Sequence, residues 1–129
     1  MSSVFSLLEG ATKRLQLQDA LFHEQCEVVL GILRSAGVLP YKRSSLNGEL
    51  HKLVAAMLVN AYDSDTSIDV ATRKAGTFHH YGYSTKIISY LDKMVGVGLL
   101  LSQRDTAKGK LVLSDLLEDY LGEVELTLA

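Results

Sequence analysis

The stretch GTFHHYGYSTK at residues 76–86 holds two adjacent histidines and two tyrosines, side chains that could bind a metal, transfer protons or contact a polymer. Adjacent residues on a regular backbone point in different directions, and no ligand spacing such as HExxH accompanies His79 and His80. His23 and Cys26 form a second possible ligand pair, but Cys26 belongs to an apolar stripe and so is interpreted as a small buried hydrophobe. We therefore predict no metal site and no cofactor.

The sequence contains no motif for nucleophilic catalysis or phosphate binding either. The serines lie in no nucleophile elbow, and VGVG at 95–98 lacks a phosphate-loop lysine at the required spacing. Cys26 is the only cysteine, which excludes an internal disulfide and a zinc site built on several thiolates. We predict that the chain is not an enzyme and has no catalytic residue.

The composition is that of an ordinary globular protein, because 47% of the 129 residues are hydrophobic and 22% are charged. The longest uncharged apolar runs, LVAAMLVNAY and MVGVGLLLS, are much shorter than the ~20 residues that a membrane-spanning helix needs. The start of the chain, MSSVFSLLEGATKR, lacks the basic leader and apolar run of a signal peptide. We expect a cytoplasmic protein of one domain with no membrane partner.

The formal net charge of −2 hides an uneven distribution of charge along the chain. Segment 73–110 carries seven bases against two acids, whereas segment 115–125 carries five acids and no base. The seven bases are Arg73, Lys74, Lys86, Lys93, Arg104, Lys108 and Lys110. Because local potential governs the encounter with a polyanion, a mildly acidic protein can still present one basic face to nucleic acid.

Apolar periodicity divides the chain into short elements. We predict helices at about 15–36, 47–62, 66–76 and 84–95, a β-hairpin at 99–113 and a helix at about 114–121. In the first helix Phe22, Cys26, Val29, Leu33 and Ala36 recur every three or four residues. The hairpin is indicated by two aliphatic runs, GLLLSQ and KLVLS, which RDTAKG separates with turn residues.

Capping residues set the predicted helix ends. Asn47, Ser84 and Ser114 are predicted N-caps, and Thr66 with Asp69 is similar to a capping box for the third helix. Gly37 is the predicted C-terminal cap of the first helix, Pro40 prevents its continuation, and Gly76 closes the third. The tail after residue 121 alternates between apolar and polar residues, a weak strand pattern.

This order of elements resembles winged helix-turn-helix transcription regulators of the MarR-like kind, over roughly residues 47–121. STKIISYLDKMVGVGLL corresponds to the recognition helix and first wing strand, SQRDTAKGK to the wing, and LVLSDLL to the second strand and a helix. The resemblance implies a mainly α fold: a winged helix-turn-helix with a two-stranded β-hairpin wing and an added N-terminal helix, forming a single domain over 1–129. Helix-turn-helix and wing would occupy about 47–113.

The resemblance further implies sequence-specific binding of double-stranded DNA, as in a small transcriptional, plasmid or phage regulator. Helix 84–95 would enter the major groove and wing 99–113 would contact the backbone. Ser84 and Thr85 would anchor phosphate at the helix N-terminus. The DNA-contacting set would comprise Arg73, Lys74, His79, His80, Tyr81, Tyr83, Ser84, Thr85, Lys86, Ser89, Tyr90, Lys93, Arg104, Lys108 and Lys110.

Each of these interpretations has an alternative that the sequence leaves open. The Lys86 to Lys93 face could be an ordinary solvated helix face, and the hairpin lysines ordinary turn residues. The wide apolar face of helix 15–36 predicts a homodimer, or else covers the core within one chain. The acidic segment 115–125 or the apolar N-terminal helix could bind another protein, so that the winged-helix fold would be a protein-interaction module without DNA binding.

Overall fold

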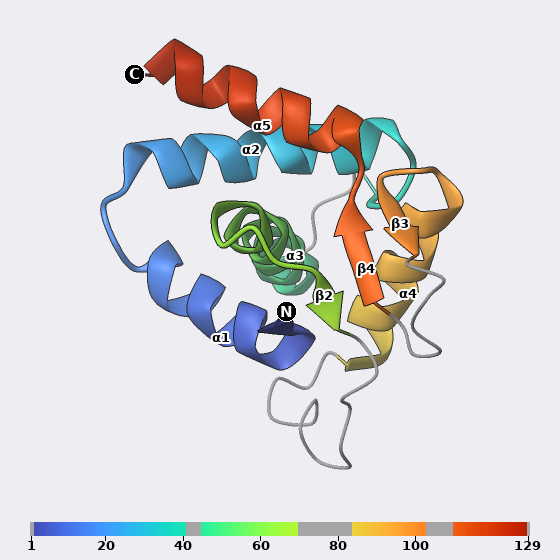
Figure 1. Cartoon of the computed structure of the whole chain (residues 1–129). Coiled ribbons are helices and arrows are strands. Elements are labelled where there is room, and N and C mark those ends of the chain that lie inside the picture. The colour runs from blue at the N-terminus through green and yellow to red at the C-terminus, as the bar shows by residue number, and fades with distance from the viewer. Residues whose placement is uncertain (1, 41–44, 70–83, 103–109, 129) are drawn as a thin grey trace.

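A computed structural model describes residues 2–40, 45–69, 84–102 and 110–128. Over these residues the chain is mainly helical, with one small sheet (Figure 1). The helices are α1 (Val4–Leu15), α2 (Ala20–Ser35), α3 (Ser45–Asp63), α4 (Ser84–Gly96) and α5 (Asp115–Leu128). The strands are β1 (Ser2–Ser3), β2 (Ile68–Asp69), β3 (Leu100–Ser102) and β4 (Lys110–Leu113). None of the described helices is long and apolar enough to cross a bilayer.

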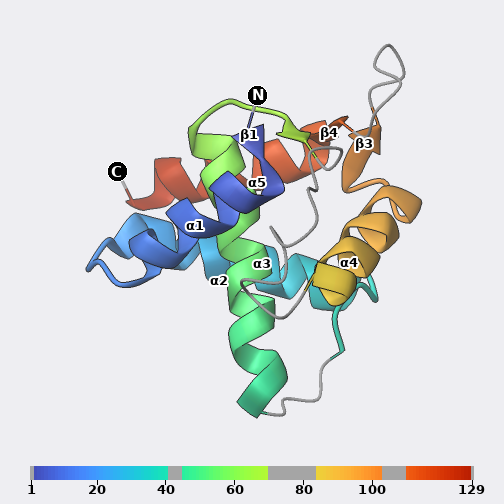
Figure 2. The same cartoon turned by 90° about the horizontal axis from the view of Figure 1, so that it is seen from below.

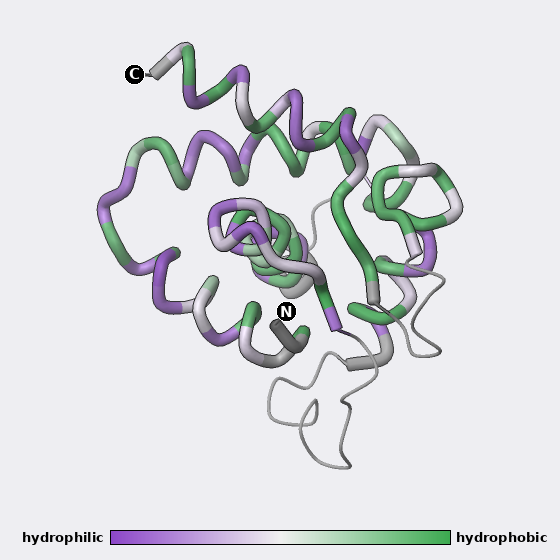
Figure 3. The backbone as a smooth tube through the Cα atoms, in the orientation of Figure 1, coloured by the Kyte–Doolittle hydropathy of each residue, from purple (hydrophilic) through white to green (hydrophobic). Residues whose placement is uncertain are grey.

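Helix α3 lies at the centre of the other elements in Figure 1, and its N-terminal end extends beyond them in Figure 2. The six consecutive residues 54–59 are all buried, so the helix is apolar on almost every side. A helix of this kind is stable only when it is covered all round. Helices α1 and α2 pack along it and α5 packs on α2, which encloses its hydrophobic turns (Figure 3).

Helix α1 packs on α3 through an apolar stripe that sequence analysis did not assign to a helix. Val4, Leu7, Leu8 and Ala11 are buried, and their spacing of three or four residues is that of one helix face. The predicted start of the helix at residue 15 is therefore wrong: α1 ends at Leu15, and α2 begins at Ala20. The chain turns between Leu15 and Ala20, where Asp19 caps α2 by accepting a hydrogen bond from the Phe22 amide at 3.0 Å.

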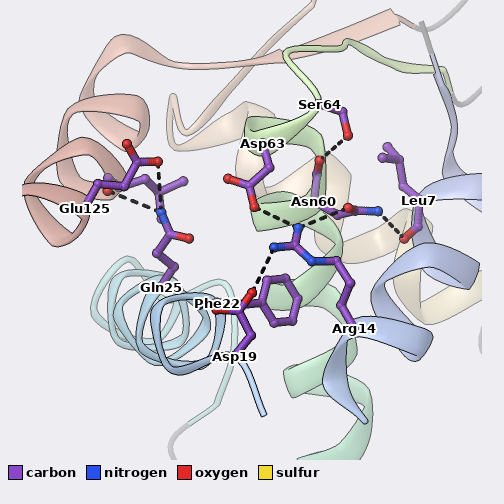
Figure 4. A network of polar contacts seen from close by, with 10 residues as sticks. Leu7, Arg14, Asp19, Phe22, Gln25, Asn60, Asp63, Ser64 and Glu125 are labelled. Carbon is purple, nitrogen blue, oxygen red and sulfur yellow. Dashed lines mark hydrogen bonds and ion pairs between the residues drawn. The ribbon is translucent and has the colours of Figure 1, made fainter. Parts of the chain in front are cut away.

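Arg14, in the last turn of α1, ties three helices together (Figure 4). Its Nη1 lies 2.7 Å from Oδ2 of Asp63 and donates to Oδ1 of Asn60 at 3.3 Å, and both partners belong to α3. Its Nη2 lies 3.7 Å from Oδ2 of Asp19, the cap of α2. The guanidinium also lies 4.0 Å from the centre of the Phe22 ring, a cation–π contact.

Helices α2, α3 and α4 end in the same way, with a residue in the left-handed region just beyond the last turn. These residues are Gly37 (φ 79°), Asp65 (φ 48°) and Gly98 (φ 80°). In each case the next amide donates to the carbonyl five residues before it, at 2.9 to 3.2 Å, as in a Schellman motif. The cap predicted at Gly37 is confirmed.

The sheet has the strand order β1-β2-β4-β3. Strand β4 pairs antiparallel with β3, in a register that sets Leu100 opposite Leu113 and Ser102 opposite Leu111. Strand β2 pairs antiparallel with the other edge of β4, and β1 runs parallel to β2. The two predicted hairpin strands are thus confirmed, and the predicted turn RDTAKG at 104–109 lies outside the described residues.

Three other predicted boundaries are wrong. Helix α3 begins at Ser45, so Asn47 lies within its first turn and is not its cap. No helix begins at Thr66, because Ile68 and Asp69 pair with β4 as strand β2. The tail is helical to Leu128 and not a strand, because Leu117, Leu121 and Val124 form one buried helix face. The rest of the predicted helix 66–76 lies outside the described residues.

Candidate nucleic-acid interface

Helix α4 (Ser84–Gly96) confirms the helix predicted at 84–95 almost residue for residue. Ile87, Leu91 and Met94 are buried on its inner face, at the spacing of an amphipathic helix. It leads through Gly98 directly into β3, against which it packs. Helix α4 and the β3–β4 pair consequently lie side by side, as both views show (Figures 1 and 2).

The outer face of α4 carries three of the predicted contact residues. Lys86, Ser89 and Lys93 are exposed and stand three and four residues apart, so their side chains leave the same face of the helix. No acid lies in the first turn, although Asp92 is an exposed neighbour of Lys93. This face offers two cations and a hydroxyl, which are groups that bind phosphate oxygens and base edges.

Tyr90 was predicted to point outward with that face, and this prediction is wrong. Its side chain is half-buried and packs against the core. Its hydroxyl lies 3.4 Å from Nε2 of His51 on α3, and the two rings meet edge to face with centroids 5.8 Å apart. The aromatic ring is drawn inward because it can bury apolar surface while its hydroxyl keeps a polar partner.

His51 is the described residue near this helix that sequence reasoning missed. It is buried beside Leu50, and the Tyr90 ring of α4 packs edge to face against it, although Lys52 next to it is exposed. Burial, followed by the positive charges of Arg34 and Lys86, lowers the pKa of His51 from its ordinary value. A histidine inside a largely apolar helix was the signal that could have identified it.

The structure does not describe the side chains of the remaining predicted contact residues. Arg73, Lys74, His79, His80, Tyr81, Tyr83, Arg104 and Lys108 lie outside the described residues. Ser84 and Thr85 are the first two residues of α4, and Lys110 is the first residue of β4, where it pairs with Asp69. Their side chains also lie outside the described part of the chain. The structure therefore brings together only the α4 residues and the two hairpin strands.

A second surface of opposite charge lies where α3, β4 and α5 meet. An open cleft of about 630 Å³ there is lined by four carboxylates: Asp63, Asp65, Glu118 and Glu125. Tyr62 lines the same cleft, and its pKa is raised by burial and then by the charge of, and a hydrogen bond with, Glu125. Sequence analysis noted the acids of the C-terminal segment but not those at the end of α3, which folding brings beside them.

The other residues considered for chemistry have structural surroundings. Nε2 of His23 lies 2.9 Å from the Leu17 carbonyl oxygen. Cys26 is fully buried, and burial raises the pKa of its thiol to about 12. Within the described ranges, no three His, Cys, Asp or Glu side chains are grouped so that they could hold a metal ion.

Comparison with protein-family models, with curated proteins and with solved structures finds no match to the chain.

Proposed function

We propose that the chain binds double-stranded DNA through a winged helix-turn-helix, as a small transcriptional, plasmid or phage regulator. The observation that carries this proposal is the exposed face of Lys86, Ser89 and Lys93 on a helix that leads directly into an antiparallel strand pair. The major groove is about 12 Å wide and accepts one α-helix. Helix α4 would enter it, and the segment joining β3 to β4 would contact the backbone.

The sheet topology also supports this proposal. A strand between α3 and α4 pairs with β4, and β4 pairs with β3, so the strands hold α4 and the hairpin on one frame. Lys93 and Lys86 then project from a helix whose position relative to the hairpin is set by packing of α4 on β3. A rigid frame of this kind lets two elements contact one duplex together.

The experiment is duplex binding across a salt series. Affinity should fall with added salt, and Lys86→Ala and Lys93→Ala should each reduce the slope of log affinity against log salt by about 0.9 if each cation contacts one phosphate. Lys13→Ala is the matched control, since Lys13 is exposed on α1 and outside the proposed face. No binding at low salt, or a slope unchanged by either variant, would exclude the proposal.

Sequence specificity needs its own measurement. A mobility shift with genomic fragments, including the region upstream of the protein's own coding sequence, should retain one or a few fragments against excess non-specific duplex. If all fragments bind equally, the chain binds the DNA backbone without reading its sequence.

A homodimer is part of the proposal, because twofold proteins read half-sites about one helical turn apart. The apolar face of α2 that first suggested a dimer packs on α3 and α5 within one chain. Tyr120 on α5 is exposed and lines a groove of about 300 Å³ together with Val28 and Val124, and Leu116, four residues before it on α5, is exposed as well. Sedimentation should give twice the chain mass and return to one mass in Tyr120→Ser, whereas a single chain mass in the wild type would exclude the dimer.

The acidic cleft favours a second candidate function, the binding of a basic protein partner. Of the four carboxylates around this cleft of about 630 Å³, Asp63 is paired with Arg14. The other three produce a negative surface that would repel DNA and attract lysine or arginine side chains. A stoichiometric partner recovered by the wild type but not by Glu118→Lys, in a chain that fails to bind duplex, would favour this function. Glu9→Lys is the charge-matched control, because Glu9 is exposed on α1 and does not line the cleft.

A further inference from the structure

His51 of α3 and Tyr90 of α4 form a polar contact between the central helix and the proposed reading helix. Nε2 of His51 lies 3.4 Å from the Tyr90 hydroxyl, and His51 as a residue is only 1% exposed. A neutral imidazole can accept the hydroxyl proton at Nε2, whereas an imidazolium can only donate. An imidazolium would keep this contact by donating its Nε2 proton to the hydroxyl oxygen, so the burial of His51, and not the contact, favours the neutral ring.

The charges around His51 make protonation more costly. Arg34 at the end of α2 and Lys86 in the first turn of α4 both act on its ring, and both are positive. On α3 itself the neighbouring charged residues are Glu49 and Lys52, which are exposed. A proton on His51 would add a third positive charge to this group, at the base of α4.

We infer that the His51–Tyr90 contact is an acid-sensitive seat for α4: protonation of His51 loosens α4 from α3 and lowers the DNA affinity of the face that α4 carries. The second half of this inference rests on the proposed function, and the first half can be measured without DNA. Helix α4 is the element that yields, because α1 and α2 enclose α3 while α4 packs mainly on β3. His51 is a positioning residue: it touches α4 at Tyr90, and its proton would add a buried positive charge that Lys86 of α4 repels.

The direction of the pH effect follows from where the proton binds more tightly. Unfolded His51 titrates near 6.5 and folded His51 titrates lower, so between these values the unfolded chain binds more protons. The stability from neutral His51 is fully present above pH 6.5 and is lost as the pH falls through the folded pKa. Across that window the folding equilibrium constant falls by up to about tenfold per pH unit relative to a chain without a titrating group at position 51.

DNA affinity should follow the fraction of molecules in which α4 is seated. One pH unit below the pKa of His51 about a tenth of the rings are neutral, so the apparent affinity for duplex should fall by about tenfold. Protonation of His79 and His80 acts in the opposite direction, because it adds positive charge in a segment predicted to face DNA. The sign of the pH dependence therefore separates the two effects.

The experiment compares the wild type with His51→Gln, which cannot titrate but can still accept the Tyr90 hydroxyl. His23→Gln is the matched control, since His23 lies on α2 beside the Leu17 carbonyl. Unfolding equilibria, an NMR titration of the His51 ring and amide exchange in α4 are measured without DNA from about pH 7.5 to about pH 5. Duplex binding is then measured over the same range.

The inference expects the wild type and His23→Gln to lose stability and α4 protection below pH 6.5 relative to His51→Gln. Parallel pH profiles for wild type and His51→Gln would overturn it. If His51→Gln does not fold, the NMR titration decides: a midpoint at or above 6.5 overturns the seat, and a lower midpoint at which the α4 amides also shift supports it.

The DNA measurement separates the two proposals. Duplex affinity that falls with acid in the wild type and stays level in His51→Gln supports both. No duplex binding at any pH, together with the expected stability difference, refutes the DNA-binding proposal and leaves the seat in place. Equal pH dependence of binding in both chains, despite that stability difference, overturns the coupling of the seat to the reading face.

Discussion

Arg14 and Asp63 are joined by an ion pair of 2.7 Å that connects the last turn of α1 to the last residue of α3. Both side chains are about 70% shielded from solvent, with 28% and 30% exposed. The same guanidinium reaches Asn60, Asp19 and Phe22, so the pair belongs to a network and not to an isolated surface contact. Networks of this kind contribute more to stability than exposed pairs do.

Removing the Arg14 side chain should destabilise the fold. Arg14→Ala leaves Asp63 without its ion-pair partner and Oδ1 of Asn60 without its donor, and it takes away the cation over Phe22. We therefore expect a loss of about 1–3 kcal/mol in the free energy of unfolding. Chemical denaturation of Arg14→Ala and of Lys13→Ala, its exposed neighbour, provides the comparison. Equal stability of the two variants would mean that the network contributes nothing.

Cys26 should resist thiol reagents as long as the chain is folded. Its side chain is fully buried, and burial raises the thiol pKa to about 12, so the reactive thiolate is scarce near neutral pH. The thiol should label slowly in buffer and rapidly in denaturant, at a rate that follows the unfolding equilibrium. Rapid stoichiometric labelling of the folded chain would contradict this expectation.

Local signals in the sequence predicted the elements that local interactions determine. The stripe of α4, the glycine that ends α2 and the hydroxyl that caps α5 were all identified, and Ser114 Oγ accepts from the Leu117 amide at 3.2 Å. The stripe of α1, at Val4, Leu7, Leu8 and Ala11, is present in the sequence at helical spacing but was not assigned to a helix. The α4 stripe and the two caps could be predicted because they depend only on residues close in the sequence.

Tertiary pairing decided what the sequence could not predict. Ile68 and Asp69 have a helix-cap pattern at Thr66 before them, yet they form a strand because β4 offers a backbone partner. Tyr90 occupies a helix position between outward residues, and only the placement of His51 on another helix draws it inward. The cleft carboxylates at the end of α3 and on α5 likewise come from distant parts of the chain.

Loss of the Glu125 charge should shift the titration of Tyr62. Burial, and then the charge and hydrogen bond of Glu125, raise the pKa of Tyr62, and Glu125→Gln should lower it toward its ordinary value of 10. Tyrosine ionisation followed by ultraviolet difference spectroscopy would show one of the six tyrosines titrating earlier. Glu123→Gln, an exposed acid of the same helix, should leave the profile unchanged.

The same Tyr62 group predicts how stability varies at high pH. A phenol whose folded pKa is raised favours the neutral form, so its contribution is fully present below pH 10 and is lost as the pH rises through the folded value. The Glu125→Gln chain should lose less stability across that window than the wild type. If both chains lose the same amount, Glu125 does not control the ionisation of Tyr62.

Two glycine-to-alanine changes should act in opposite directions, although the substitution is the same. Gly98 has φ 80°, and a Cβ there meets left-handed strain of about 1–2 kcal/mol, so Gly98→Ala should destabilise the junction of α4 with β3. Gly31 lies inside α2, and a Cβ there meets nothing within 4 Å. Gly31→Ala should therefore stabilise the chain by about 0.5–1 kcal/mol through helix propensity. Thermal or denaturant unfolding measures both, and a stabilising Gly98→Ala would show that the strand junction tolerates another backbone conformation.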